Sequence, residues 1–536
     1  MAAPPRTAPQ SLLPDTMRNK RSSSTTREIR RTSTPSPLDR SSGILLHPTS
    51  LPSRYGIGDF GAGAREFVDF LHAAHQRVWH VLPLGPTGDS NSPYECRSSF
   101  AGNPLLVSPD LLAERGYLAK TELRRIPKFT NDKVSFADVR RFKLALLRSA
   151  FMNFERDEEF SRFERDNAHW LDRYATFMAL REANSGVCWT HFKSDSQASP
   201  ENVEFHKFVQ FEFHRQWGAL RRYCRERDVR ILGDLPFYVQ HDSADLWCAP
   251  ELFDLTADGD PRTVGGVPPD RFTEDGQFWG NPTYRWDRMK RDGFSWWIAR
   301  LRATLDRVDI LRLDHFRGFE AYWKIPAASD TARGGAWARA PGLELFKAAR
   351  KQLGDLPLIA ENLGVITEKV EALREAFGLP GMAVLQFAFD SDNAHRPHNY
   401  TRNTVAFTGT HDNNTTEGWW RALHQAAETN PAARRQLHEA QAYLQTNGHP
   451  IHWALIRTAM NSIAQLAIVP LQDVLGLGSE ARMNIPGTSE GNWTWRFRDG
   501  QLTPALADRL AALTEAAGRH RHRAECASRA DARTAA

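Results

Sequence analysis

The stretch Ile310–Gly318, ILRLDHFRG, joins a buried-strand pattern to a cluster of ionisable side chains. Branched apolar residues open it, and Arg312, Asp314, His315 and Arg317 then follow one another closely. An acid between an arginine and a histidine at the end of a strand fits two interpretations. One is a structural ion cluster and the other is the floor of an active site, since ion-pair networks also gather such residues. This stretch alone favours neither, so the other strand ends must decide.

Other apolar stretches of the chain also end in polar side chains, namely Asp234, Glu361, His411 with Asp412, and Asp473. No serine with a histidine base, no P-loop and no dinucleotide-binding glycine pattern accompanies them, so the available chemistry is that of carboxylates. Carboxylates that face one cavity can transfer glycosyl groups. One ionised group attacks the anomeric carbon, and a second, kept protonated, donates to the leaving oxygen. Arg312 lies two residues before Asp314, on the same strand face, and can hold Asp314 anionic.

A metal site is the competing interpretation of these residues, because Asp, Glu and His also bind Mg²⁺ or Zn²⁺. The chain has neither HExxH nor a comparable spaced set of ligands. Its five cysteines form no CxxC pair, which indicates free thiols in a reducing compartment: Cys96, Cys188, Cys224, Cys248 and Cys526. We therefore expect no metal and no other cofactor.

Eight short apolar stretches are the elements that would position the acids. They are 43–47, 78–84, 230–236, 308–314, 356–361, 383–389, 404–410 and 466–473. Each is apolar almost throughout, as strands of a parallel sheet covered on both faces are. Amphipathic stretches such as Ala64–Ala74 and Ile366–Phe377 lie between them. The pattern predicts an α/β fold, a (β/α)₈ TIM barrel, with Asp314, Glu361 and Asp412 at the ends of its fourth, fifth and seventh strands.

The spacing of these strands is uneven, which predicts two large insertions after strands 2 and 3. The first, at about 110–228, contains the helical stretches Asp138–Glu155 and Glu204–Arg227. The second, at about 243–300, is rich in Gly, Pro and Trp and predicts an elaborated loop domain. Insertions that follow barrel strands lie at the active-site end and form subdomains around the cleft. We expect one catalytic barrel over residues 41–525 that includes both insertions.

Both ends of the chain differ in composition from this barrel. Residues 1–40 are rich in Arg, Ser, Thr and Pro and poor in acids, which indicates a disordered basic extension. An organelle transit peptide has a similar composition. The expected location is therefore the cytoplasm of a bacterium, or a plastid stroma if residues 1–40 are a transit peptide. Residues 526–536 are expected to be a tail, and the RHRHR tract around His520 a solvated helix end.

The net charge of +5 is small for 536 residues, and no central basic stripe carries interleaved aromatic residues, so we expect no nucleic-acid partner. No apolar run approaches the roughly 18 residues that cross a bilayer, so we expect no membrane partner either.

Long blocks of the sequence, from Gly43 to Arg498, resemble the 4-α-glucanotransferases called amylomaltases or disproportionating enzymes. These form glycoside hydrolase family 77 in the α-amylase clan. The blocks include GILLHPTSLPSRYGIGDFG, LPLGPTGDSNSPYECRSSFAGNPLL, GDLPFYVQHDSADLW, LRLDHFRGFEAYWKIP, LIAENLGVIT, FTGTHDNNTTEGWW and LGLGSEARMNIPGTSEGNWTWR.

The resemblance implies a role for each matching position. Asp314 matches the nucleophile, Glu361 the general acid/base, and Asp412 a third carboxylate that stabilises the transition state. The positions that match sugar-binding residues are Arg312, His315, His411, Tyr94, Gln277, Trp279, Asn281 and Asn484. The chain departs from the family pattern at His80, Arg271, Asn362 and Asn414. The two asparagines replace aspartates, so less negative charge lies near Glu361, which would lower its pKa.

The implied activity is transfer of a segment of an α-1,4-glucan to the 4-hydroxyl of glucose or another α-1,4-glucan. It would proceed with retention, through a covalent glucosyl-enzyme. The partners are then maltodextrins, segments of starch or glycogen, and glucose, and we favour a monomer. A retaining hydrolase like the α-amylases is the alternative enzyme, because hydrolysis and transfer share every catalytic residue. A non-catalytic glycan-binding module is the alternative from another class.

Overall fold

The computed structural model describes residues 39–269, 274–389, 394–445 and 450–520. Eight parallel strands form its centre: β1 (Ser41–Leu45), β2 (Val78–His80), β3 (Arg230–Leu235), β6 (Ile310–Leu313), β9 (Leu358–Ala360), β10 (Gly381–Val384), β11 (Thr404–Phe407) and β12 (Leu466–Pro470). They are hydrogen-bonded in the order β10-β11-β12-β1-β2-β3-β6-β9. Each predicted stretch overlaps one of them, although β1 and β10 begin two residues before their predicted stretches, so all eight predicted strands are confirmed.

The two strands at the ends of this order, β9 and β10, are joined outside the regular ladder. The backbone N–H of Ala360 donates to the carbonyl of Pro380 at 2.9 Å. The side chain of Asn362 adds a second link, because its Oδ1 accepts from the backbone N–H of Met382 at 2.8 Å. The sheet is therefore a nearly closed barrel, which confirms the predicted (β/α)₈ fold.

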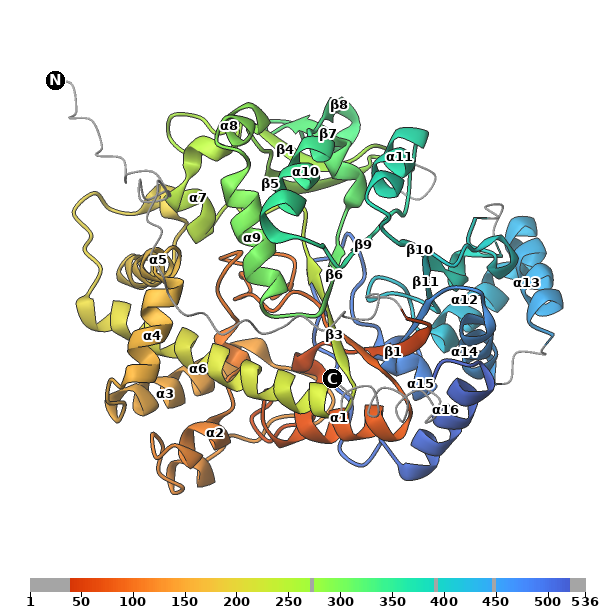
Figure 1. Ribbon diagram of the computed structural model, residues 1–536, viewed down its shortest axis with the longest axis horizontal. Coiled ribbons are helices and arrows are strands. Elements are labelled where there is room, and N and C mark those ends of the chain that lie inside the picture. The colour runs from red at the N-terminus through yellow and green to blue at the C-terminus, as the bar shows by residue number, and fades with distance from the viewer. Residues whose placement is uncertain (1–38, 270–273, 390–393, 446–449, 521–536) are drawn as a thin grey trace, which may run out of the picture.

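Helices surround the barrel in Figure 1. They include α1 (Ala62–Ala73), α6 (Pro200–Glu226), α9 (Ser295–Leu305), α10 (Gly342–Leu353), α11 (Glu368–Ala376), α12 (Thr416–Thr429), α13 (Pro431–Leu444), α14 (Ile451–Asn461), α15 (Leu471–Val474) and α16 (Pro504–Ala516). Helix α1 shows why such segments are helical. In α1 the buried residues Ala64, Phe67, Val68 and Leu71 recur at helical spacing, so one apolar stripe faces the barrel.

The insertion after β2 is helical, as expected, and forms the left flank of Figure 1. It contains α2 (Pro109–Glu114), α3 (Phe136–Met152), α4 (Glu158–Asn167) and α5 (Leu171–Ala183) before α6 returns the chain to the barrel. The predicted helices Asp138–Glu155 and Glu204–Arg227 correspond to α3 and α6. Both helices begin and end earlier than predicted.

The insertion after β3 contributes half of a second sheet. It carries α7 (Ala244–Cys248), β4 (Thr263–Val267), β5 (Gln277–Pro282) and α8 (Trp286–Arg291). The segment after β6 supplies β7 (Ala321–Pro326) and β8 (Ala336–Arg339), and the four strands pair antiparallel as β5-β4-β7-β8. We call these four strands the small sheet; it lies at the top of Figure 1. The sequence did not predict β7 and β8, because β7 pairs with β4 of a different insertion and β8 pairs only with β7 among the described strands.

The two ends of the described chain meet at the beginning of the barrel strands. Arg519 is fully buried, and its guanidinium donates to six carbonyls, which belong to Ser41, Ala459, Met460, Ser462, Ala464 and Gln465. The expectation of a solvated RHRHR tract is therefore wrong at Arg519, because the carbonyls at the end of α14 and beside β12 need a donor. Residues 1–38 and 526–536, with the predicted extension and tail, lie outside the described residues.

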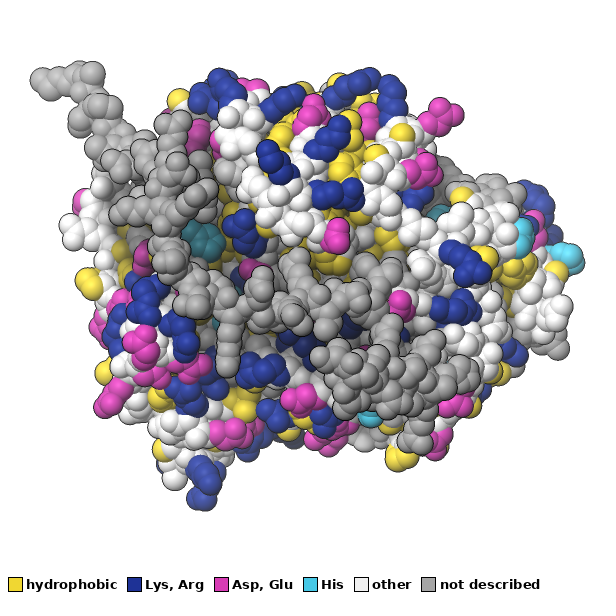
Figure 2. Space-filling model, viewed as in Figure 1, with side chains coloured by type: hydrophobic (Ala, Val, Ile, Leu, Met, Phe, Trp, Pro, Cys, Tyr) yellow, Lys and Arg dark blue, Asp and Glu magenta, His cyan; other side chains and the backbone are white. Residues whose placement is uncertain are grey.

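On the face shown in Figure 2, acidic and basic side chains are interspersed over the described residues. Within that part of the chain, every helix is too short or too polar to cross a membrane.

Candidate active site

The three predicted catalytic carboxylates follow three different barrel strands. Asp314 comes directly after β6, Glu361 directly after β9, and Asp412 five residues after the end of β11. The carboxyl ends of parallel strands meet at one end of a barrel, so these side chains share the end where active sites form. The other two acids at strand ends are Asp234 and Asp473. Their hydrogen-bond partners are described below.

Asp314 is held against its neighbours by both its backbone and its side chain. Its N–H donates to the carbonyl of Leu235 at 3.0 Å, and its Oδ1 lies 3.0 Å from Nη1 of Arg312. The contact expected between Arg312 and Asp314 is therefore present. Burial raises the pKa of Asp314 to about 6, while Arg312 opposes that rise. Near neutral pH Asp314 is then mostly ionised, as a nucleophile must be.

Glu361 is fixed by two backbone donors, one at each carboxyl oxygen. The N–H of His315 donates to Oε2 at 2.7 Å, and the N–H of Leu363 donates to Oε1 at 2.9 Å. Burial raises the pKa of Glu361 to about 8; Arg312 opposes this, and the like charge of Asp314 adds to it. Glu361 thus keeps its proton near neutral pH, as a general acid must.

Asp412 has the opposite electrostatic setting. Its carboxylate accepts from Nδ2 of Asn484 at 2.7 Å and lies 3.3 Å from Nε2 of His411. Burial opposes its ionisation, but His411 and Asn484 outweigh burial and lower the pKa of Asp412 to about 2. Arg482 donates to the Asp412 carbonyl at 2.6 Å and so fixes the backbone. Asp412 is a permanent anion.

Asp234, at the end of β3, connects two of the predicted sugar-binding residues. Its Oδ2 accepts from Nη1 of Arg312 at 2.6 Å and from the hydroxyl of Tyr94 at 2.7 Å. The ring of Tyr94 is stacked on His411, with centroids 5.0 Å apart, and Trp493 lies against both rings. The sequence placed Asp234 at a strand end but did not predict this bridge, and it gave no sign of Trp493.

Three predicted sugar-binding residues lie on β5 of the small sheet. Gln277 and Trp279 alternate along the strand, so their side chains share one face, whereas Gly280, with a φ of 74°, interrupts the alternation before Asn281. Trp279 donates to Oε1 of Gln277 at 3.0 Å and meets the ring of His315 edge-on at 4.9 Å. Asn281 instead donates to the carbonyl of Val239 at 3.2 Å. The small sheet therefore brings an aromatic side chain onto the loop that follows Asp314.

His315 has a neutral imidazole at the start of this loop. Burial, with a smaller effect of Arg317, lowers its pKa to about 3. Its φ of 48° is in the left-handed region, so the chain turns sharply after Asp314. Within the described residues its Nε2 is buried without a hydrogen-bond partner.

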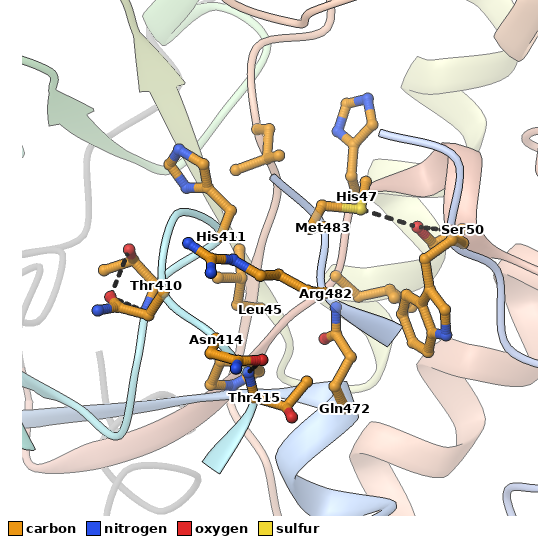
Figure 3. A pocket seen from close by; sticks show the side chains of 15 residues that line it. Leu45, His47, Ser50, Thr410, His411, Asn414, Thr415, Gln472, Arg482 and Met483 are labelled. Carbon is orange, nitrogen blue, oxygen red and sulfur yellow. Dashed lines mark hydrogen bonds between the residues drawn. The ribbon is translucent and has the colours of Figure 1, made fainter. Parts of the chain in front are cut away.

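A cavity of about 20 Å³ lies beside His411, between the ends of β1, β11 and β12. Figure 3 shows the Arg482 guanidinium reaching toward His411, with His47 and Ser50 on the other side. The cavity is large enough for about one water molecule and too small for a sugar. It belongs to the support of the His411–Asp412 segment.

Asp473 does not join the three carboxylates. It is buried, and it accepts from the Thr408 hydroxyl at 2.6 Å and from the N–H of Thr416 at 2.7 Å. It thereby fixes the start of α12 to the end of β11. The expectation that Asp473 faces the site is not supported by these contacts, because both carboxylate oxygens are engaged within the scaffold.

The departures from the family pattern have separate surroundings. His80 is buried at the end of β2, edge-on to Phe407, and burial lowers its pKa well below its usual value. Asn362 links β9 to β10, and Asn414 donates to the hydroxyl of Ser479 at 2.9 Å. Arg271 lies outside the described residues. Among the residues that are described, no group of three or more His, Cys, Asp or Glu side chains is placed to hold a metal ion.

Comparisons with known proteins agree with one another. The family model described as 4-alpha-glucanotransferase, glycoside hydrolase family 77, matches residues 46–503. A 4-alpha-glucanotransferase of Synechocystis sp. is 48% identical over 90% of this chain and 98% of its own length. One from Thermus thermophilus is 47% identical, over 90% of this chain and 99% of its own. The solved amylomaltase from Streptococcus agalactiae in complex with acarbose superposes with a TM-score of 0.85 at 37% identity, covering 90% of this chain and all of that one.

Proposed function

The chain belongs to glycoside hydrolase family 77, the 4-α-glucanotransferases, and on that premise we propose that Asp314, Glu361 and Asp412 catalyse its reaction. The reaction is the transfer of a segment of an α-1,4-glucan to the 4-hydroxyl of glucose or another α-1,4-glucan, with retention of configuration. The assignment rests on one observation above all. Three carboxylates at one end of the barrel have widely separated pKa values, of about 6, 8 and 2.

In the first step the ionised carboxylate of Asp314 attacks the anomeric carbon of the donor glucan. Glu361 gives its proton to the leaving glycosidic oxygen as that bond breaks, and the shortened glucan departs. Arg312 touches Asp314 and so lowers the free energy of its ionised form. The product of this step is a β-linked glucosyl-enzyme on Asp314.

In the second step Glu361, now ionised, acts as the base. It takes the proton from the 4-hydroxyl of the acceptor, whose oxygen attacks the anomeric carbon and releases Asp314. Two inversions restore the α linkage. The pKa of Glu361 suits both roles. Burial and the charge of Asp314 hold this pKa near the working pH in the first step, and the loss of that charge in the glucosyl-enzyme lowers it for the second.

Asp412 is proposed to stabilise the positive charge that develops on the sugar ring in the transition state of each step. Its permanent negative charge and its fixed backbone suit that task. The remaining proposed sugar contacts surround the carboxylates: Arg312, His315, His411, Tyr94, Gln277, Trp279, Asn281 and Asn484. The stacked Tyr94–His411 pair offers a flat aromatic face, a surface suited to a sugar ring.

Transfer prevails over hydrolysis when a sugar acceptor outcompetes water at the glucosyl-enzyme. The small sheet supports this preference, because β5 lays Trp279 against His315. We further propose that the substrates are maltodextrins and that the enzyme acts in a bacterial cytoplasm, in keeping with the bacterial relatives that match nearly the whole chain.

Product analysis from pure maltotriose tests this function. Disproportionation yields glucose together with maltopentaose and longer maltodextrins, whereas simple hydrolysis yields maltose and glucose alone. The Asp314→Asn variant is the matched control, since it keeps the shape of the side chain and loses its nucleophilic charge. Longer products from the wild type and none from Asp314→Asn are expected. Maltose and glucose alone would establish the hydrolase instead, and an active Asp314→Asn would refute the proposed nucleophile.

A further inference from the structure

Three successive residues join the loop after β6 to the loop after β9. The N–H of His315 donates to the carboxyl of Glu361 at 2.7 Å, and the N–H of Phe316 donates to the Glu361 carbonyl at 3.2 Å. The third is a side chain: Nη1 of Arg317 donates to the carbonyl of Val365. Glu361 is thus fixed directly, and the far end of its loop is fixed by Arg317.

Arg317 is only 6% exposed, and its guanidinium donates to two carbonyls and stacks on a ring. Its Nε donates to the carbonyl of Ala321 at 3.3 Å. The face of its guanidinium lies over the ring of Trp337, 3.7 Å from the centroid. A planar fork can donate in two directions and stack at the same time, which the point charge of a lysine cannot do.

Trp337 brings the small sheet into this contact. It lies on β8, opposite Trp323 of β7, and their rings meet edge-on at 5.1 Å. The same sheet carries Trp279 on β5, which touches His315. Arg317 therefore lies where the loop of Asp314, the loop of Glu361 and the small sheet meet.

We propose that Arg317 is a positioning residue that fixes the Glu361 loop against the small sheet and so aims the Glu361 carboxyl at the leaving oxygen. This inference rests on the proposed role of Glu361 and extends it. Without Arg317 the loop is held only at its start, by Glu361 and Asn362, and Val365, already 54% exposed, loses its tie. A displacement of about 1 Å in an acid catalyst costs on the order of a hundred-fold in rate.

The test compares two donors that differ in their need for an acid. Maltotriose needs a proton on its leaving sugar. With α-maltosyl fluoride, Asp314 attacks the anomeric carbon as the carbon–fluorine bond breaks, and fluoride departs unprotonated. For Arg317→Met we expect kcat/KM on maltotriose to fall about a hundred-fold. The burst of fluoride release, which reports only the first step, should change by less than about three-fold.

Three further variants make the result specific. Arg317→Lys keeps the charge without the fork and should recover only part of the maltotriose activity. Trp337→Leu removes the stacked ring at the surface and should cost about ten-fold on maltotriose alone. Arg333→Met, on an exposed arginine paired with Asp275, should match the wild type on both donors.

The basic limb of the pH profile supplies a second readout. A loosened loop admits water to Glu361, which lowers its raised pKa, so the limb should move to lower pH in Arg317→Met. Equal losses on the two donors with an unmoved limb would overturn the inference.

Glu361→Gln separates this inference from the proposed function. It should abolish maltotriose turnover and keep the fluoride burst. If Glu361→Gln behaves in this way and the Arg317 variants lose activity equally on both donors, only the inference about Arg317 fails. If Glu361→Gln still turns over maltotriose, the assignment of Glu361 itself fails.

Discussion

At the scale of single residues, Arg312 lies near two carboxyl groups, Asp314 and Glu361, whose pKa values differ. Arg312 favours the ionised form of both Asp314 and Glu361, yet of these two it contacts Asp314, through an ion pair of 3.0 Å. Glu361 instead bears the added repulsion of Asp314, so its pKa rises further. The different roles of the two groups thus follow from their positions around Arg312.

This arrangement predicts a bell-shaped dependence of kcat/KM on pH. Activity falls below about pH 6, because protonation removes the Asp314 nucleophile, and above about pH 8, because Glu361 loses the proton it must donate. The two apparent values belong to the coupled pair rather than to either residue alone. Initial rates on maltotriose across this range check it. A profile without a basic limb would contradict a protonated Glu361.

Replacing Tyr94 with phenylalanine tests the bridge through Asp234. The variant keeps the ring that stacks on His411 but removes the hydroxyl that donates to the buried Asp234. We expect the free energy of unfolding to fall by about 2 kcal/mol, because the other Asp234 oxygen has no partner among the described residues. Urea unfolding measures this.

Arg312 should turn further toward Asp234 in this variant and support Asp314 less. The pKa of Asp314 then rises, so the acid limb of the activity profile should move to higher pH. An unchanged unfolding midpoint with an unchanged acid limb would show that the hydroxyl has no such part.

At the scale of elements, the side chain of Asn362 supplies one of the links that close the barrel between β9 and β10. Asn362 accepts from Met382 and donates to Oε1 of Glu371 on α11, at 2.8 Å each. Asn362→Ala should lower the free energy of unfolding by about 2 kcal/mol, since it leaves the Met382 N–H without its partner. Asn362→Asp keeps the acceptor for Met382 but replaces the donor to Glu371 by a repelling carboxylate oxygen, so it should also lower the free energy of unfolding.

Asn362→Asp should also change catalysis in a defined direction. A second carboxylate next to Glu361 disfavours its ionisation, so the pKa of Glu361 rises and the basic limb of activity moves to higher pH. Parallel urea unfolding and pH–rate measurements on the two variants check both statements. Equal stability of Asn362→Ala and the wild type would contradict the proposed closure.

Two neighbouring residues of β5 test the small sheet as a cover for the site. Trp279 lies against His315, whereas Phe278 is on the opposite face of the strand and is 40% exposed. Trp279→Ala should raise KM for maltotriose about ten-fold and increase the hydrolysed share of products, because water gains access to the glucosyl-enzyme. Phe278→Ala is the matched control and should match the wild type. The assay is product chromatography, and equal effects of the two variants would contradict a one-sided cover.

The elements differ in how far the sequence could predict them. Barrel strands such as β6 are short, continuous apolar stretches of the sequence, so their composition alone identified them. Their predicted ends overran into the loops, as at Thr410 and Asp473, because apolar side chains continue where the ladder stops. Strands β7 and β8 were missed because β7 pairs with a strand from another insertion.

The same limit applies to the site. The acids Asp314, Glu361 and Asp412 stand at strand ends, which periodicity reveals. The partners that tune them, such as Asp234 and Trp493, come from other segments, and only the fold brings them to Tyr94.

At the scale of the whole molecule, the two ends of the barrel have different tasks. The carboxyl ends of the strands carry the carboxylates and the small sheet. At the opposite end Arg519 joins the close of α16 to β1, to the end of α14 and to the start of β12. In this fold the carboxyl ends of the strands typically carry the active site, and the opposite end typically contributes to stability.

Arg519→Met should therefore destabilise the protein without changing its chemistry. Removing a buried guanidinium leaves several carbonyls without a donor, and we expect a loss of about 3 kcal/mol in the free energy of unfolding. Arg40 donates to four carbonyls of the same region but is more exposed, so Arg40→Met is the milder control. Urea unfolding should rank the variants below the wild type in that order, while kcat and both limbs of the pH profile stay unchanged at temperatures where all three are folded. A shifted limb of the pH profile in Arg519→Met would mean that the end of the barrel opposite the carboxylates also influences the pKa values of Asp314 and Glu361.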